Sequence, residues 1–271
     1  MNVSAINLYP IKSLGGIALQ KALVCFQGLE NDRRWMLVTP ESKMITQREC
    51  PLLATLTPAV GPDGLRIATQ DGREVFVPHD AGSWTDTEIT VDIWGHAYVG
   101  VPAIQTINNT VGDIIGMPCQ LLSIRADVFR TKRDVAFHDD APILMISESS
   151  LEELNQHLAV PLPMNRFRPN VVVRDAGPFE EDGWQRVAIG NAIFRAVKAC
   201  LRCVTTTIDQ AMGTPRGPEP LATLAKFRRQ GEGVAFGLYC RPEQAGATIR
   251  LGDTVTVLAA NYSVQAAAQT D

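Results

Sequence analysis

The sequence predicts a mainly β protein with some helix, an α+β fold in which a small β-barrel domain precedes a second β-rich domain. Short alternating segments, separated by turn residues, fill the first hundred residues. A helical spacing of apolar residues follows, and strand-like runs then resume around a few helices. The chain has 271 residues, of which 45% are apolar, so it is long enough to build one large or two ordinary domains.

Hairpins dominate the N-terminal part. The clearest pairs residues 65–67 with residues 75–77 across Asp71-Gly72, a dipeptide typical of tight turns. A second hairpin is expected from residues 89–93, through a turn at Gly95-His96, into residues 98–101. Alternating or β-forming runs predict further strands at residues 3–8, 22–25, 35–38 and 53–56. This spacing of short strands is typical of a small barrel or sandwich.

The pattern then changes to a helical one. Apolar residues recur at helical spacing up to Gly116, a typical helix end; they are Ile104, Ile107, Val111, Ile114 and Ile115. We therefore place a domain boundary near Pro102, which gives an N-terminal domain of residues 1–102 and a second domain of residues 103–264. Residues 265–271 are expected to form a flexible tail.

The second domain is predicted to be β-rich with a few helices. One helix is expected to begin at Ser149, whose hydroxyl would cap the helix while Glu152 reaches back in a capping box. Another is expected from Pro220 to Phe227. Strands are expected at residues 143–146, 171–173, 187–189, 193–197, 204–208, 235–239 and 248–257, the last of them broken by Gly252-Asp253.

Composition argues against several classes of partner. The 25 basic and 29 acidic residues give a net charge of −4 without a block of like charge, so no nucleic-acid partner is expected. No apolar run reaches the length of about 18 residues that a membrane span needs. The sequence shows no secretory signal at its start, and its six cysteines fall short of a disulfide scaffold. We therefore expect a cytoplasmic protein with reduced thiols and no membrane partner.

The strongest chemical signal is the pair Cys200 and Cys203, which lies between β-forming runs. A structural zinc site would need a second close pair of ligands, and neither Cys240 nor the four dispersed histidines supply one. A thioredoxin-like redox pair would need a helix N-terminus, whereas residues 204–208 favour a strand. Two further interpretations are buried cysteines that pack as small hydrophobic residues, and one thiolate that binds a soft transition metal. Arg202 could stabilise such a thiolate or bind an anion.

These residues also carry a family resemblance. The motif Cys-x-Arg-Cys, followed by Thr-Thr and an Asp, resembles the signature of MOSC proteins, which are named after the C-terminal domain of molybdenum cofactor sulfurase. Other motifs of that family follow in matching order along nearly the whole chain: YPIKS (residues 9–13), DRRW (32–35), FHDDAP (137–142), SESSL (147–151), RFRPN (166–170), EPLATL (219–224) and FGLY (236–239). The resemblance is to the subgroup of the mitochondrial amidoxime reducing component and its bacterial counterparts.

The resemblance implies a MOSC N-terminal β-barrel domain, a β-barrel MOSC core with peripheral helices, and a molybdenum–pterin cofactor (Mo-molybdopterin). It implies that Cys203 is the metal ligand and the catalytic residue, because molybdenum accepts soft sulfur. By the same resemblance the cofactor is contacted by Lys12, Ser13, Arg33, Arg168, Asn170, Arg202 and Tyr239. Asp139 and Asp209 would orient these donors.

Ordinary structural roles compete with these assignments. Arg33 and Arg168 could make surface ion pairs, and Lys12 and Ser13 could form a turn. Asn170 could end a strand. Tyr239 could be a core residue. These alternatives stay open for the sequence alone.

The activity implied by the resemblance is the molybdenum-dependent reduction of small N-hydroxylated compounds such as amidoximes and hydroxylamines. Apart from Cys240, no cysteine follows Cys203 that could bind an iron–sulfur cluster, so electrons are expected from a separate ferredoxin- or cytochrome-type donor protein. Leu201 and Asp140-Ala141 depart from hydroxyl residues of the mitochondrial proteins, which leaves the substrate open.

The alternative function is a carrier that transfers sulfur or the molybdenum cofactor through a persulfide on Cys203. Sulfurases usually join their MOSC part to a pyridoxal-phosphate-dependent desulfurase, and the resemblance implies pyridoxal phosphate binding only at the level of the family. A chain of 271 residues leaves no room for such an enzyme. We therefore expect the reductase rather than the carrier.

Overall fold

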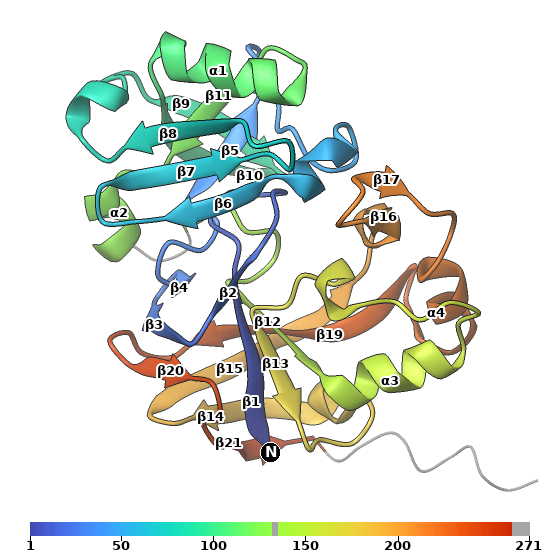
Figure 1. Cartoon of the computed structure of the whole chain (residues 1–271). Helices are drawn as coiled ribbons and strands as arrows, with labels where there is room; N and C mark the ends of the chain where they lie inside the picture. The colour runs from blue at the N-terminus through green and yellow to red at the C-terminus, as the bar shows by residue number, and fades with distance from the viewer. Residues whose placement is uncertain (132–134, 262–271) are drawn as a thin grey trace, which may run out of the picture.

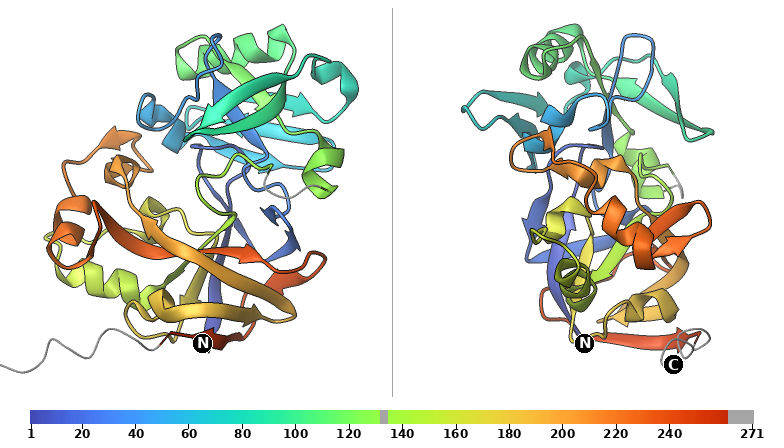
Figure 2. Two further views of the ribbon diagram at one scale, coloured as in Figure 1. Left: turned by 180° about the vertical axis from the view of Figure 1, so that it is seen from behind. Right: turned by 90° about the vertical axis from the view of Figure 1, so that its right-hand side faces the viewer.

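Two β-rich regions stack on each other in the computed structural model, which describes residues 1–131 and 135–261 (Figure 1). Residues 35–131 form the upper region of Figure 1, and residues 1–29 together with residues 143–261 form most of the lower one. The two further views in Figure 2 show the same separation. The predicted mainly β, α+β fold is confirmed.

The upper region contains two antiparallel sheets and a helix that packs on them. One sheet has the strand order β5-β11-β10-β9, and the other has the order β6-β7-β8. Helix α1 (Gln105–Ile115) contributes Ile107 and Val111 to their common apolar core. The other elements of this region are β5 (Trp35–Val38), η1 (Pro51–Thr55), β6 (Thr57–Val60), β7 (Gly64–Ala68), β8 (Glu74–Pro78), η2 (Ala81–Ser83), β9 (Ile89–Ile93), β10 (His96–Pro102), β11 (Gln120–Ser123) and α2 (Ala126–Thr131).

Both predicted hairpins of this region are present. β7 pairs with β8 in the expected register, with Leu65 opposite Val77. β9 pairs with β10, but their turn is Trp94-Gly95 rather than the predicted Gly95-His96. The two turn residues have φ angles of 55° and 85°, and positive φ at both positions is the mark of a two-residue type I′ turn.

The lower region is built on one long sheet with the strand order β2-β1-β13-β12-β19-β15-β14-β21, in which β18 also pairs with β19. β12 and β13 are parallel, and the other described pairs of this sheet are antiparallel. Its strands are β1 (Asn2–Leu8), β2 (Ile17–Leu19), β12 (Ile143–Ser147), β13 (Val171–Arg174), β14 (Trp184–Ile189), β15 (Ala192–Leu201), β18 (Arg229–Gln230), β19 (Gly233–Pro242) and β21 (Val255–Ala260).

Smaller elements complete the lower region. One short sheet contains β20 (Thr248–Arg250), β3 (Lys21–Cys25) and β4 (Gly28–Leu29). Another pairs β16 (Ile208–Asp209) with β17 (Thr214–Pro215). Helices α3 (Glu148–Gln156) and α4 (Leu221–Phe227) bury Leu154 and Leu224 in one cluster with Phe236 of β19. The 3₁₀ helices here are η3 (Met164–Arg166), η4 (Glu180–Gly183) and η5 (Val204–Thr207).

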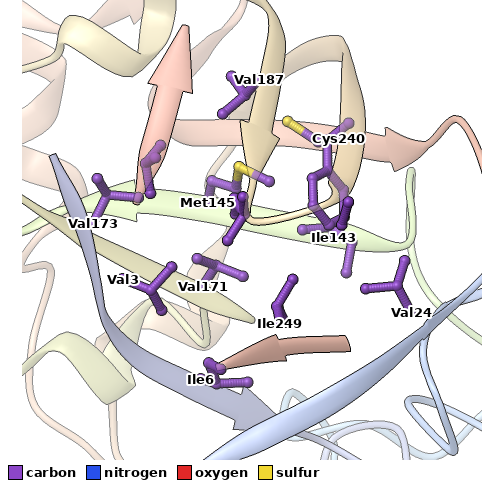
Figure 3. Close-up of a cluster of buried hydrophobic side chains, with 14 of the residues drawn as sticks. Val3, Ile6, Val24, Ile143, Met145, Val171, Val173, Val187, Cys240 and Ile249 are labelled. Atoms are coloured by element: carbon purple, nitrogen blue, oxygen red, sulfur yellow. The ribbon is translucent and has the colours of Figure 1, made fainter. Parts of the chain in front are cut away.

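The main apolar core lies against the long sheet (Figure 3). Val3 and Ile6 of β1, Ile143 and Met145 of β12, and Val171 of β13 are each at most 1% exposed and meet there. Burying such side chains is the main source of folding free energy. The first strand of the chain therefore completes a core whose other strands come mostly from beyond residue 142.

Two expected strands are 3₁₀ helices instead. Residues 204–207 form η5, in which the Thr206 hydroxyl donates to the Cys203 carbonyl oxygen at 2.9 Å and the Thr207 hydroxyl to that of Val204 at 2.8 Å. Hydroxyls that bond to nearby carbonyls compete with strand pairing, which explains the error. The strand expected at residues 53–56 overlaps η1, which begins at Pro51, a residue suited to the first turn of a helix.

The helix predictions are close to the structure. Helix α1 ends as predicted before Gly116, whose φ of 75° is left-handed. Helix α4 begins directly after Pro220. The expected cap of α3 is wrong by two residues, because Ser147 Oγ, not Ser149, accepts the Ser150 backbone N–H at 3.1 Å.

The boundary predicted near Pro102 stays a prediction. Helix α1 and β11 follow Pro102 in the chain and pack in the upper region, whereas β1 belongs to the long sheet of the lower region. The tail predicted at residues 265–271 lies outside the described residues. No helix within the described ranges has the length and apolar character needed to cross a membrane.

Candidate functional site

All residues predicted to bind the metal or the cofactor line one pocket of about 260 Å³. They are Lys12, Ser13, Arg33, Arg168, Asn170, Arg202, Cys203 and Tyr239. The upper region adds Thr46, Arg48 and Trp94 to its wall, so segments far apart in the chain meet here. The structure thus brings the predicted residues together, and their roles in binding stay predictions.

An ion pair between the buried Lys12 and the exposed Asp139 forms one wall. Lys12 is only 5% exposed, and its Nζ donates to Asp139 Oδ1 at 2.6 Å. The same oxygen accepts from Trp94 Nε1 at 2.9 Å. Burial opposes ionisation of this carboxyl, but Lys12 and Trp94 outweigh it and hold the pKa of Asp139 well below its ordinary value. Burial also lowers the pKa of Lys12, although Asp139 counteracts the change.

Two arginines are fixed against one tyrosine. The guanidinium carbons of Arg33 and Arg168 lie 4.4 and 4.3 Å from the centroid of the Tyr9 ring. Arg33 Nη1 also pairs with Oδ2 of the buried Asp32 at 2.5 Å. Arg168 Nη1 donates to the Leu14 carbonyl oxygen at 2.6 Å, and burial lowers the pKa of Arg168 to about 10. Both cations are therefore held in place before any ligand arrives.

The backbone is left-handed at four pocket residues. The φ angles are 70° at Ser13, 48° at Arg33, 55° at Trp94 and 55° at Arg168. Residues other than glycine rarely adopt this conformation, and strained backbone costs about 1–3 kcal/mol per residue and gathers at functional sites. The strain is a physical reason to treat this pocket as the functional site.

Cys203 lies between β15 and η5 and is partly exposed. Its Sγ is 3.2 Å from Thr205 Oγ1. Burial opposes ionisation of the thiol, but hydrogen bonds from the Thr205 hydroxyl and backbone, together with Arg48, lower the pKa of Cys203 below its ordinary value. A thiol with these neighbours is prepared to act as a thiolate ligand or nucleophile.

Cys200 has a different environment. It is 1% exposed in an apolar cluster with Phe167 and Phe236, and burial raises the pKa of its thiol. Arg202 Nη1 donates to Cys200 Sγ at 2.7 Å, and Nη2 donates to the Phe167 carbonyl oxygen at 2.8 Å. Arg202 thus bonds to Cys200 rather than to Cys203. Within residues 1–131 and 135–261, no group of three His, Cys, Asp or Glu side chains could hold a metal ion.

The remaining predicted residues differ in their surroundings. Asn170 donates to the Asn7 carbonyl oxygen and accepts from the Leu144 backbone N–H, both at 3.2 Å, so it ties strands together at the pocket. Burial raises the pKa of Tyr239 well above its ordinary value. Asp209 pairs with Arg166 at 3.5 Å and Arg216 at 3.4 Å, and it is not among the described residues that line the pocket.

Sequence reasoning missed several pocket residues, and Arg48, Trp94 and His138 are the ones with the most distinctive chemistry. His138 lay inside a quoted motif but was given no role. It is 6% exposed, and neither ring nitrogen has a hydrogen-bond partner among the described residues. Burial, with Lys12 and Arg33 nearby, lowers the pKa of His138 to about 3. No local sequence signal marks Arg48 or Trp94.

Sequence comparison assigns the chain to a family. The model of the MOSC N-terminal beta barrel domain matches residues 1–118, and that of the MOSC domain matches residues 132–256. The chain is a MOSC protein. This MOSC protein is 31% identical to the mitochondrial amidoxime-reducing component 1 of Mus musculus, over 94% of its own length and 82% of the relative.

Other relatives extend this picture. The MOSC protein is 28% identical to the molybdenum cofactor sulfurase of Oryza sativa subsp. japonica, over 88% of its own length but only 32% of the sulfurase. Among solved structures, the YuaD protein of Bacillus subtilis aligns over 94% of each chain, with 11% identity and a TM-score of 0.41. A likeness that distant carries no functional conclusion.

The pocket residues fit a molybdenum–pterin cofactor in their chemistry. Cys203 offers soft sulfur, which suits molybdenum. Lys12, Arg33 and Arg168 are cations that a cofactor phosphate would need. His138 and Arg202 Nε are buried polar groups without a described partner, as expected where a ligand supplies the missing hydrogen bonds.

Proposed function

We propose that this MOSC protein binds a molybdenum–pterin cofactor and reduces N-hydroxylated compounds with electrons from a separate donor protein. One observation carries the proposal: the Cys203 thiol, whose pKa is lowered, opens onto a pocket with four buried or half-buried cations, Lys12, Arg33, Arg168 and Arg202. The similarity to an amidoxime-reducing component supports the choice of substrate class.

Different residues of the chain would bind different parts of the cofactor. Cys203 would bind the metal, and Lys12, Arg33 and Arg168 would bind the phosphate with Ser13 and Asn170 beside them. Arg202 and Tyr239 would contact the remainder of the cofactor. When bound, the cofactor would supply a metal that accepts the substrate oxygen and stores electrons.

The overall reaction balances without another reactant from this chain. The N–O bond of the substrate breaks, its nitrogen is reduced, and its oxygen leaves as water after two electrons and two protons have been added. The electrons come from the donor protein, which we propose to be of ferredoxin or cytochrome type, and the protons come from solvent. Because Cys203 is partly exposed in the pocket, a substrate can reach it from solvent.

Metal content tests the proposal. Wild-type protein purified from a host that makes the cofactor should contain near-stoichiometric molybdenum by inductively coupled plasma mass spectrometry. Cys203→Ser should lose it, whereas Cys25→Ser, at another partly exposed cysteine in β3, should keep it. Loaded wild type should then reduce benzamidoxime with an artificial electron donor. Molybdenum-loaded protein without turnover would refute the reductase activity.

A carrier function is the second candidate, and the similarity to molybdenum cofactor sulfurase favours it. A thiol with a lowered pKa can also carry a persulfide. Under this proposal, wild-type protein would fold without molybdenum and its Cys203 peptide would gain the mass of one sulfur atom. Loss of that mass on thiol reduction would favour the carrier over the reductase.

A further inference from the structure

Trp94 stands where a bulky residue is costly. It is the first residue of the type I′ turn between β9 and β10, a position that Asn, Asp and Gly prefer because φ is positive. Trp94 is 50% exposed and lines the pocket, and its indole Nε1 donates to Asp139 Oδ1. A strained turn that presents a half-exposed indole to a pocket indicates a role for the ring itself.

Arg48 joins this indole to the thiol. Its guanidinium carbon lies 4.5 Å from the Trp94 ring centroid, which is a cation–π contact. The same guanidinium is close enough to Cys203 to help lower the pKa of that thiol. Arg48, Trp94 and Cys203 therefore line one side of the pocket together, although they come from three distant segments.

Exposed apolar side chains flank the thiol as well. Leu201 lines the pocket and is 49% exposed, and Val204, next to Cys203 in the chain, is also 49% exposed. Leu201 can therefore contact an apolar part of a ligand in the pocket. This mouth thus combines a half-exposed tryptophan, aliphatic groups and the Arg48 guanidinium. Its carboxylates, Asp139 and Asp140, are each paired with a lysine.

We propose that Trp94, Arg48 and Leu201 form a substrate subsite that prefers flat, apolar and uncharged N-hydroxylated compounds and rejects cations. The inference rests on the proposed reductase function and specifies which substrates the enzyme would prefer. A planar ring would stack on the indole and contact Leu201, while the Arg48 guanidinium beside the indole would repel a positive charge. An amidoxime is neutral at pH 7 and its amidine product is protonated, so Arg48 would favour substrate over product.

Benzamide and benzamidine test the subsite without turnover, since they share a ring and a shape but differ in charge. We expect molybdenum-loaded wild type to bind benzamide more tightly than benzamidine in isothermal titration calorimetry. Trp94→Ala should weaken benzamide binding about fivefold, whereas Trp94→Phe, which keeps a ring but loses the bond to Asp139, should weaken it less than about twofold. Arg48→Gln should reduce the difference in affinity between benzamide and benzamidine, because the variant lacks the charge that repels benzamidine.

Phe76→Ala is the matched control. Phe76 lies in β8, is 38% exposed and stacks with Arg66 at 4.7 Å, but it does not line the pocket described here. The control should bind both ligands as wild type does. Equal affinity of wild type for benzamide and benzamidine, or unchanged benzamide binding by Trp94→Ala, would overturn the subsite.

Turnover separates this inference from the function on which it rests. Hydroxylamine has no ring, so Trp94→Ala should raise KM for benzamidoxime about fivefold and leave KM for hydroxylamine unchanged. If wild type reduces neither compound, the reductase proposal fails, and the calorimetry still decides the subsite. If both are reduced and Trp94→Ala changes the two KM values equally, the subsite fails while the reductase stands.

Discussion

The apolar core and the deepest polar groups at the pocket are buried to nearly the same degree but differ in what burial does to stability. Ile143 and Met145 of the core are fully buried in an apolar cluster. Lys12 and His138 of the pocket, and Asp32, which pairs with the pocket residue Arg33, are at most 6% exposed. Burying an apolar side chain stabilises the fold, whereas burying a charge or an unpaired polar group costs free energy unless a partner compensates it.

The pocket compensates its charges only in part. Asp32 pairs with Arg33, and Asp139 pairs with Lys12. Arg168 bonds to a carbonyl oxygen and lies on the Tyr9 ring, without a carboxylate of its own among the ion pairs found in the described residues. The wall therefore holds an excess of positive charge that the fold does not need. Such an excess is suited to an anionic ligand, and it makes the wall the less stable of the two interiors.

Breaking a buried pocket pair should produce the largest effect. Asp32→Asn removes the charge that compensates Arg33 and keeps an acceptor for the Tyr9 backbone N–H, so it should lower the free energy of unfolding by about 3–5 kcal/mol in urea titrations. Adding Arg33→Met should restore part of this loss, because no buried charge is then left alone. A loss of less than about 1 kcal/mol in the free energy of unfolding of Asp32→Asn would mean that this pair behaves like a surface ion pair, against the expectation for a buried one.

The core provides the contrast to that experiment. Ile143→Ala should cost about 2–5 kcal/mol through lost burial and a cavity. Removing a second core side chain beside it should deepen the loss instead of reversing it. Recovery by a second substitution is therefore the feature that distinguishes the charged wall from the apolar core.

Local patterns predicted the strands well where turn chemistry and alternation agreed. Residues 65–67 and 75–77 pair in the expected register because their apolar side chains alternate on both sides of a Gly72 turn with a φ of 87°. Residues 204–207 were misassigned because β-branched threonines favour a strand by composition, while their hydroxyls bond to nearby carbonyls in the folded chain.

The site residues were predicted from sequence motifs. Trp94 and Arg48, which the prediction missed, stand in none of these motifs. Cys203, Arg33 and Arg168 stood in quoted motifs, and they do line one pocket. Trp94 reaches Asp139 from a hairpin turn 45 residues earlier in the chain. That contact depends on how two regions pack, and no local spacing of residues encodes it. The roles of the predicted residues stay open to the experiments above.

Lowering the pH should reduce the stability of the fold through protonation of His138 at the pocket, since the described residues of the apolar core contain no group that takes up a proton in acid. The ordinary pKa of 6.5 applies in the unfolded chain, and burial with Lys12, Arg33 and Arg241 nearby lowers it to about 3 in the fold, although Asp139 opposes this. Between these values the unfolded state binds more protons, so stability present above pH 6.5 is lost as pH falls toward 3. The largest contribution is about 1.4 kcal/mol per pH unit.

Urea titrations between pH 7 and pH 4 measure this contribution as the difference between wild type and His138→Gln. The variant should lose less stability over that range. His157→Gln is the control, because His157 lies at the surface, where its side chain is 49% exposed beside Glu153. Parallel pH profiles for wild type and His138→Gln would mean that this imidazole is not held neutral in the fold.

The smallest effect is expected at a surface ion pair that makes more hydrogen bonds than the buried Asp32–Arg33 pair. Glu243 accepts from Arg186 Nε and Nη2 at 3.0 and 2.8 Å, and Arg195 lies 3.3 Å away. Arg186 is 44% exposed, so water competes for each of these bonds and salt screens them. Glu243→Gln should leave the urea midpoint unchanged within error, at low and at high salt. A loss comparable to that of Asp32→Asn would mean that the number of hydrogen bonds, and not burial, sets the value of an ion pair in this protein.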